Sequence, residues 1–471
     1  MNTSALSSLA QKPTLEAPKP FRAPPPQIFR VPGGGEVWLV EDHDLPVVAI
    51  SMGFPVGSAD DPLDRPGLAS ITAGMLDEGA GDLDALQLSD AINELGATLW
   101  AGTGTDGTRV ALSVLKKHLP RAFGIFADVV ARPRFDEDEW QRVTALWRGR
   151  LEKRADDPRA VAAITRQAVL YGADTPYGHP VAGQLDGAAK ITRDDALAFY
   201  RAHYRPDTAR MVVAGAITRE EVVALWREHF GTWAPPASTP APKRIAPPTP
   251  LSVRPRLVVV DRPGSQSVLS IVNAGAKADS PEMPLLELVN TALGGSFTSR
   301  LNQNLREDHG WTYGARSRFS ETRGVGGFYA SAAVSTDVTA AALNEMLGEL
   351  RKMADDGLEP AELTKVRAGD LTDMIQTNER IDSVVGRLMT LALLELPPER
   401  DARASEARQR ATLEQLNALA RRFIDPTDAT VVVVGPATAV RPQLAALGLG
   451  EPTLWGADAR PAAANGKPTS D

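Results

Sequence analysis

The pattern of apolar and polar positions changes period repeatedly along the chain. Short apolar or alternating runs predict strands, and apolar residues spaced three or four apart predict helices. In the first part, strands are predicted at 28–31, 36–40, 47–54, 98–102, 108–114 and 211–214. Helices are predicted after Pro66 and at 83–95, 118–130, 136–154, 159–170, 194–204 and 219–230. The order of these elements indicates an α+β fold.

A proline-rich stretch interrupts this pattern at 234–255 and contains few large apolar residues. Such composition is typical of a semi-rigid linker. After it, strands are predicted at 257–260, 268–272, 312–319, 327–334 and 430–434. Helices are predicted at 285–293, 340–355, 361–394 and 413–423, with a further short helix near residue 300.

The two patterned regions resemble each other in sequence. Residues 56–62 correspond to 275–281, residues 95–100 to 309–313, and residues 211–215 to 432–435. We therefore predict a duplication: two homologous α/β-sandwich-like halves, each a mainly antiparallel sheet packed with helices and each with its own core. The predicted boundaries are an extended leader at 1–26, halves at 27–233 and 256–450 joined by the linker at 234–255, and a flexible tail at 451–471.

Composition narrows the possible functions. The 471 residues are 43% hydrophobic and 23% charged, as in ordinary globular proteins. A net charge of -8 argues against a nucleic-acid-binding surface. No apolar run is long enough to predict a membrane span. The absence of cysteine excludes disulfides, thiolate zinc sites and cysteine nucleophiles.

The strongest candidate chemistry lies in residues 294–314, which read as a glycine turn, a short helix, a second glycine turn and the start of a strand. Arg306 falls on the last helical turn, and Tyr313 follows seven residues later. A guanidinium and a phenol in one space would bind a carbonyl, a carboxylate or a peptide backbone. The alternative is that Arg306 pairs with a surface acid and Tyr313 belongs to the core.

This stretch resembles the C-terminal half of the pitrilysin-type (M16) zinc peptidases. The shared pattern is Gly-Gly-Ser-x-x-Ser-Arg-Leu, then Leu-Arg-Glu, then Gly-x-x-Tyr. The resemblance implies a clam-shell of two duplicated halves around a cavity. It also implies that Arg306 and Tyr313 bind substrate from the side opposite the zinc.

Peptide-cleaving members of that family carry His-x-x-Glu-His on the first long helix of the N-terminal half. Here the surrounding frame is kept, but Ser70, Ala73 and Gly74 replace the two histidines and the glutamate. The family's third ligand, a glutamate before an Asp-Asp-Pro turn, corresponds to Arg150. We therefore expect no metal and no catalytic residue in this chain.

Other motifs add no second chemistry. Of the six histidines, the nearest two, His179 and His203, are 24 positions apart, so no His-x-x-x-His pair exists. His179 is expected to be a hydrogen-bonding loop residue. The glycine clusters at 33–35 and 102–107 each join two predicted strands, which predicts turns rather than phosphate-binding loops. A Gly-x-Ser-x-Gly elbow is absent.

In the small bacterial (M16B) branch of this family, one subunit carries the zinc and the other supplies the Arg/Tyr pair. The resemblance implies that this chain is the second kind: a non-catalytic, peptide-binding subunit whose His-x-x-Glu-His partner holds zinc. The alternatives are a structural relative like the core proteins of respiratory complex III, a chaperone-like relative, and a self-sufficient enzyme with an unfamiliar site. The leader lacks an apolar core, so we expect the periplasm if a signal sequence has been removed and the cytoplasm otherwise.

Overall fold

The computed structural model describes residues 23–235 and 242–462. The predictions for residues 1–22, 236–241 and 463–471, which belong to the leader, linker and tail, lie outside this part of the chain. No helix within it is both long and apolar enough to cross a membrane.

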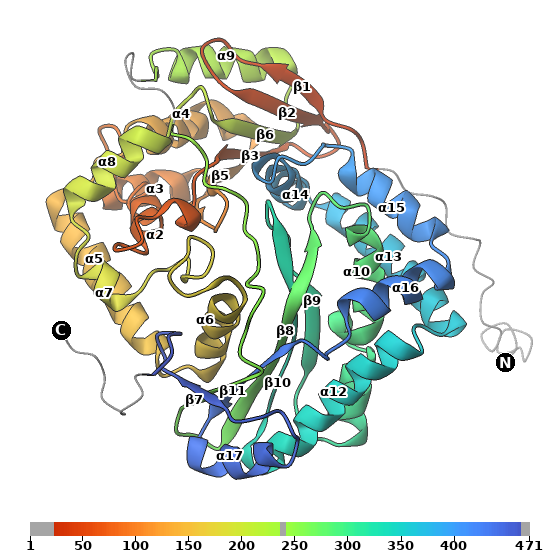
Figure 1. Ribbon diagram of the computed structural model, residues 1–471. Coiled ribbons are helices and arrows are strands. Elements are labelled where there is room, and N and C mark those ends of the chain that lie inside the picture. The colour runs from red at the N-terminus through yellow and green to blue at the C-terminus, as the bar shows by residue number, and fades with distance from the viewer. Residues whose placement is uncertain (1–22, 236–241, 463–471) are drawn as a thin grey trace, which may run out of the picture.

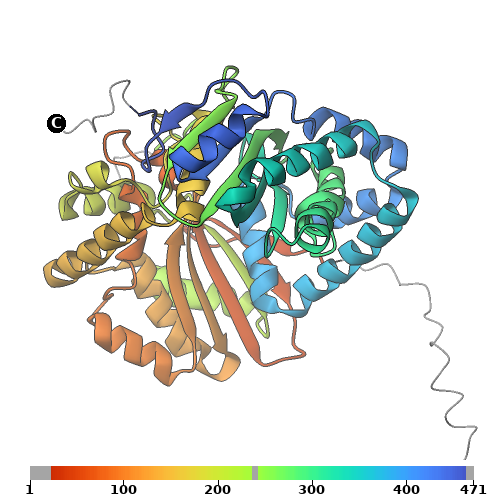
Figure 2. The same cartoon turned by 90° about the horizontal axis from the view of Figure 1, so that it is seen from below.

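Each half is built on one mixed, mostly antiparallel sheet, and the described residues give each sheet six strands, five of them in equivalent order. The sixth differs, because β1 is antiparallel to β2 whereas β12 is parallel to β7. The N-terminal sheet runs β1 (Gln27–Arg30), β2 (Glu36–Glu41), β6 (Arg210–Gly215), β3 (Val47–Phe54), β5 (Thr108–Leu115) and β4 (Thr98–Thr103). The C-terminal sheet runs β12 (Thr453–Trp455), β7 (Leu257–Asp261), β11 (Thr430–Gly435), β8 (Gln266–Lys277), β10 (Val325–Ser335) and β9 (Ala315–Phe319). Figure 2 shows the orange N-terminal strands and the green C-terminal strands as two separate layers. The predicted α+β fold of two homologous halves is confirmed.

Helices lie against both sheets. Those of the N-terminal half are α2 (Leu68–Gly74), α3 (Ala85–Glu94), α4 (Leu119–Ala131), α5 (Glu137–Arg154), α6 (Pro158–Tyr171), α7 (Leu185–Ala188), α8 (Arg193–His203) and α9 (Arg219–Phe230). Those of the C-terminal half are α10 (Met283–Asn290), α11 (Arg300–Asn302), α12 (Thr339–Asp355), α13 (Pro360–Glu379), α14 (Ile381–Leu393), α15 (Arg400–Arg410), α16 (Leu413–Phe423) and α17 (Ala437–Ala445). Two π-helical turns, η3 (Thr291–Gly295) and η4 (Gln303–Asp308), flank α11.

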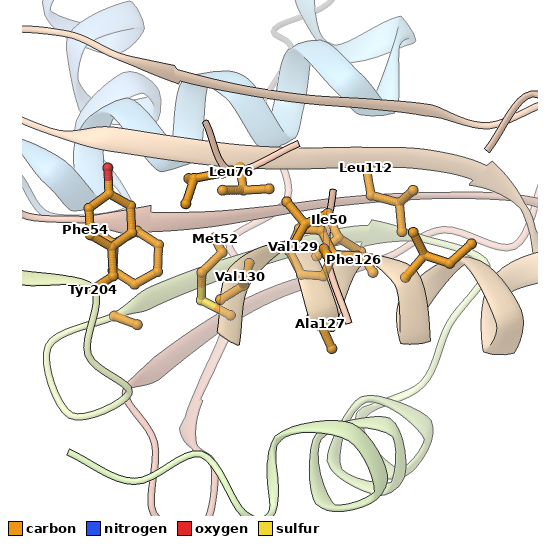
Figure 3. Close-up of a cluster of buried hydrophobic side chains, with 14 of the residues drawn as sticks. Ile50, Met52, Phe54, Leu76, Leu112, Phe126, Ala127, Val129, Val130 and Tyr204 are labelled. Carbon is orange, nitrogen blue, oxygen red and sulfur yellow. The ribbon is translucent and has the colours of Figure 1, made fainter. Parts of the chain in front are cut away.

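The N-terminal core fills the space between its sheet and helices. Met52 from β3 packs with Phe126 from α4, and Phe54 packs with Tyr204 at the end of α8 (Figure 3). These side chains follow the alternation of β3 and the helical spacing of α4, so their burial agrees with the sequence pattern.

The halves exchange one helix each, which the sequence pattern did not predict. Helix α6 packs its apolar face on β8 and β11 of the C-terminal sheet, and α14 packs on β3 and β6 of the N-terminal sheet (Figure 1). Val161 and Val169 of α6 lie in one cluster with Val272, and Met389 of α14 lies in another with Val212. Each half has a core cluster of its own, as predicted, but two further clusters contain residues of both halves, so the halves are not separate in their packing.

A buried polar cluster also joins the halves. Arg323, between β9 and β10, pairs with Asp106 of the β4–β5 turn at 2.8 Å, and both side chains are less than 10% exposed. The Tyr177 hydroxyl donates to Asp106 and accepts from Arg323 at 2.9 Å. Arg244, on the linker, donates to the Asp106 carbonyl and pairs with Glu395. This inter-half cluster ties the linker to both halves.

Three other differences from the predicted elements concern the C-terminal half. The single helix predicted at 361–394 is two helices, because Arg380 adopts an extended conformation that turns α14 onto the other sheet. Helices α15 and α17 were not predicted. Part of the predicted flexible tail forms β12, which pairs in parallel with β7 and completes the sheet.

Candidate substrate-binding site

Helix α2, where the resemblance places a zinc site, is held in place in the N-terminal half by hydrogen bonds and close packing. The carboxylate of Asp61 accepts hydrogen bonds from the backbone N–H groups of Gly67 and Ala69, each at 2.7 Å. Gly67 has φ +107°, and a Cβ there would collide with Trp147 of the neighbouring helix α5. Gly67 and Ala69, which frame the positions where the family carries His-x-x-Glu-His, therefore have a structural role of their own.

The residues at the ligand positions do not fit zinc. Ala73 is buried and apolar, Gly74 has no side chain and faces open space, and Ser70 offers only a partly exposed hydroxyl. Arg150 is an exposed cation on α5. No group of three histidines, cysteines or carboxylates that could hold a metal ion occurs in residues 23–235 and 242–462. The side chains at these four positions supply none of the imidazole, thiolate or carboxylate donors that bind zinc.

Close packing fixes the backbone of the second candidate region. A Cβ on Gly294 would lie 2.5 Å from the Ser317 backbone N, so only glycine allows η3 to approach β9. The buried Asn302 side chain donates to the Ser296 carbonyl and accepts from the Ala315 N–H at 2.9 Å. Arg300 pairs with Glu362 of α13 at 2.6 Å. The segment that presents Arg306 is therefore held at both ends.

Arg306 projects from η4 and is about one third exposed. Its guanidinium carbon lies 4.2 Å from the ring centroid of Phe297, a cation–π contact that orients the side chain. Its Nε is 3.6 Å from Glu307, and its Nη1 has no hydrogen-bond partner within the described residues. π-Helical turns are frequent at functional sites. Arg306 thus has one buried donor nitrogen without a partner in the described residues, while the rest of its guanidinium is partly exposed.

Tyr313 lies in the loop between η4 and β9 and is 93% exposed. The loop is tied down by hydrogen bonds from the Trp311 N–H to the Leu305 carbonyl and from the Thr312 hydroxyl to the Ala333 carbonyl. The alternative is therefore wrong for Tyr313, which is not a core residue, whereas Arg306 does pair with a surface acid, Glu307. Within the part of the chain that the structure describes, no hydrogen bond or ring contact joins Tyr313 to Arg306.

The sequence pattern did not predict the contact between Phe297 and Arg306. An exposed aromatic residue between two glycines and the start of a helix was a possible signal for it. His179 is buried, its Nδ1 lies 3.3 Å from the Pro180 carbonyl, and burial lowers its pKa. This agrees with a hydrogen-bonding loop residue.

Comparisons with known families give two matches along the chain. Residues 36–175 match the family described as insulinase (peptidase family M16), and residues 190–369 match the one described as peptidase M16 inactive domain. An uncharacterised zinc protease of Mycobacterium tuberculosis is 26% identical over 86% of this chain and 92% of its own length. The non-peptidase homolog YmxG of Helicobacter pylori is 21% identical over 84% of this chain and 90% of its own.

Solved structures agree in fold. The peptidase M16 inactive domain from Pseudomonas fluorescens has a TM-score of 0.79 at 24% identity, over 87% of this chain and 98% of its own. A protease from Helicobacter pylori has a TM-score of 0.80 at 19% identity, over 88% of this chain and all of its own. A chain of complex III from Candida albicans has a TM-score of 0.74 at 12% identity, over 89% of this chain and 99% of its own.

Proposed function

The chain belongs to the peptidase M16 family and is a non-catalytic relative within it, and from this premise we propose that it is the substrate-binding subunit of a two-chain zinc metallopeptidase that degrades or processes peptides. The partner would be an M16 chain that bears His-x-x-Glu-His and holds the zinc. Arg306 and Tyr313 would reach the substrate from the opposite side of a shared cavity.

The observation that carries this proposal is the exposure of the Tyr313 side chain, together with a partly exposed Arg306 that leaves one nitrogen unpaired in the described residues. The Tyr313 phenol is 93% exposed, so its contribution to the core is negligible. Arg306 leaves one nitrogen without a hydrogen-bond partner among the described residues, although the backbone around it is fixed. Donors held in place and left free can bind a substrate carbonyl and stabilise charge that develops on it.

The rival function is a structural subunit, as the similarity to a complex III chain would suggest. That similarity is one of fold alone. A purely structural subunit gains nothing from a phenol that is 93% exposed or from a guanidinium nitrogen without a partner in the described residues, and this supports peptide binding.

The experiment pairs this chain with a His-x-x-Glu-His chain of the same organism and measures kcat/KM on a short peptide. Arg306→Ala should lower kcat/KM. The drop should correspond to a loss of about 2–4 kcal/mol in transition-state binding, because a charged double donor is lost. The assembly of the two chains, checked by size, should persist.

Arg421→Ala is the matched control, since Arg421 is an exposed arginine on α16 of the same half. It should leave turnover unchanged. Undiminished turnover of the Arg306→Ala complex would refute the substrate-binding role and support the structural alternative.

A further inference from the structure

A group of arginines lies on the opposite face of the C-terminal sheet from its own helices. Along β9, Ala315 and Ser317 are buried against the helices of this half, whereas Arg316 and Arg318 are exposed. Successive side chains of a strand point to opposite faces. Arg316 and Arg318 therefore share the face on which α6 packs.

The strand register brings these arginines beside a buried tyrosine. Arg318 is paired with Tyr329 of β10, and Arg316 with Ser331. The guanidinium carbon of Arg318 lies 5.7 Å from the Tyr329 ring centroid, and that of Arg166 on α6 lies 5.2 Å from the same centroid. Two cations from different halves thus share one aromatic ring.

No carboxylate balances these charges. Within residues 23–235 and 242–462, none of Arg166, Arg316 and Arg318 has an ion pair or a side-chain hydrogen bond. Burial lowers the pKa of the Arg166 guanidinium, and the nearby charge of Arg318 lowers it further. The sequence has 59 acidic and 51 basic residues, so a general excess of cations does not explain the group.

The N-terminal half shows that the fold does not require charged side chains on this edge strand. The equivalent edge strand β4 has the sequence Thr-Leu-Trp-Ala-Gly-Thr and carries no charged side chain. Partly desolvated like charges in proximity are unfavourable unless an anion compensates them. A carboxylate is the best match, since its two oxygens fit the planar guanidinium fork.

We propose that Arg166, Arg316 and Arg318 form a carboxylate-binding site for an acidic group of a bound peptide. The proposal rests on the proposed function and specifies its substrate class. Arg316 and Arg318 follow Tyr313 by three and five residues, so they lie at most roughly 10 and 17 Å from it along the chain. The site selects peptides whose C-terminal carboxylate or acidic side chain lies within five residues of the position bound at Tyr313.

The test is calorimetric titration of the full chain with three decapeptides of otherwise identical sequence. The first has a free C-terminal carboxylate and no acidic side chain, the second is its C-terminal amide, and the third is the amide with one internal glutamate. At least one of the two acidic peptides should bind roughly ten-fold more tightly than the plain amide. Which one does so identifies the source of the carboxylate.

Arg318→Gln and Arg166→Gln should remove this difference and leave the affinity for the plain amide unchanged. Arg318 is exposed, so its variant should fold even if the Arg166 variant does not. Arg159→Gln, an exposed change on the same helix α6, should have no effect. Equal binding of the three peptides, absence of binding, or equal weakening of all three by Arg318→Gln would overturn the proposal.

A failure of the proposed function gives a different result. Arg306→Ala should weaken all three peptides alike, because it acts on the backbone near the scissile bond rather than on the acidic group. Suppose that Arg306→Ala leaves all three affinities unchanged while Arg318→Gln removes the preference for the acidic peptides. The carboxylate site is then supported, and the substrate-binding role of Arg306 is refuted.

Discussion

The two halves of the chain share the order of five strands, and each packs one helix on the sheet of the other, yet their candidate sites have diverged in opposite directions. In the N-terminal half, α2 keeps its packing residues and offers no ligand at Ser70, Ala73 or Gly74. In the C-terminal half, Tyr313 is exposed and Arg306 keeps one nitrogen without a partner in the described residues, on a backbone fixed by hydrogen bonds. The fold is therefore maintained independently of the chemistry it carries.

The difference follows from where each side chain lies. Leu68, Ile71 and Met75 of the α2 region are buried, so their loss would leave cavities and destabilise the half. Ser70 and Gly74, which lie between them, are partly exposed and can change with a smaller penalty. Tyr313 is exposed and adds little to the core, so stability does not account for its presence, and Arg306 is only partly buried.

The first prediction tests whether the halves depend on each other. Arg323→Ala should lower the free energy of unfolding by about 3–5 kcal/mol, because Asp106 would remain a buried and unpaired carboxylate. Denaturant titration measures this change. Arg121→Ala is the control, since its pair with Glu94 is about 60% exposed and contributes at most about 1 kcal/mol. Equal effects of the two changes would show that the inter-half cluster does not hold the halves together.

The second prediction concerns the retained site. Tyr313→Phe should cost about 1–3 kcal/mol in transition-state binding in the assembled peptidase, because one hydroxyl donor is removed. The melting temperature of the isolated chain should not change, since the side chain is 93% exposed. A drop in melting temperature without a change in kcat/KM would instead assign Tyr313 a structural role.

The third prediction uses pH to examine the region after α2. Burial raises the pKa of Asp77 from 3.8 to about 6. A carboxyl whose pKa is raised in the folded state favours folding when protonated, so this contribution is present below pH 3.8 and is lost as the pH rises through about 6. The shift is worth at most about 3 kcal/mol.

Asp77→Asn should therefore stabilise the protein by about 1–2 kcal/mol at pH 8 and have little effect near pH 4. Asp90→Asn is a suitable control, because Asp90 is an exposed carboxylate on α3. Urea titrations at both pH values measure the difference. An equal effect of Asp77→Asn at the two values would contradict the raised pKa.

The smallest effect is expected at the degenerate position on α5. Arg150→Ala should change stability by less than about 0.5 kcal/mol, because the side chain is exposed and has no ion pair in the described chain. Turnover of the assembled peptidase should also be unchanged. A loss of activity comparable to that of Arg306→Ala would show that the N-terminal site has acquired a new role.

Much of the fold was predictable, because the local sequence determines a helix or strand wherever its apolar residues recur with a clear period. Strand β3 and helices α9 and α16 have the predicted bounds. The break at Arg380 was not predictable, since no glycine or proline marks it and the turn depends on the sheet that α14 covers. Strand β12 was missed because a three-residue parallel edge strand exists only through its pairing with β7.

For the candidate site, the sequence identified Arg306 and Tyr313 and the loss of the metal ligands. It did not identify Phe297, whose contact with Arg306 depends on the bend between η3 and α11. Arg166 and Arg318 could not be linked from sequence either, because they are 152 positions apart and meet only through the exchange of α6.

The sequence by itself determined the duplicated α+β architecture, the absence of zinc donors on α2 and the location of the Arg/Tyr segment. These are local properties, set by the period of apolar residues and by side-chain chemistry at fixed spacing. The tertiary structure alone decided that the halves share two core clusters, that Arg323 and Asp106 form a buried pair, and that Arg166 and Arg318 meet at Tyr329. Those features join residues far apart in the chain, and they exist only because each half buries an apolar helix face against the sheet of the other.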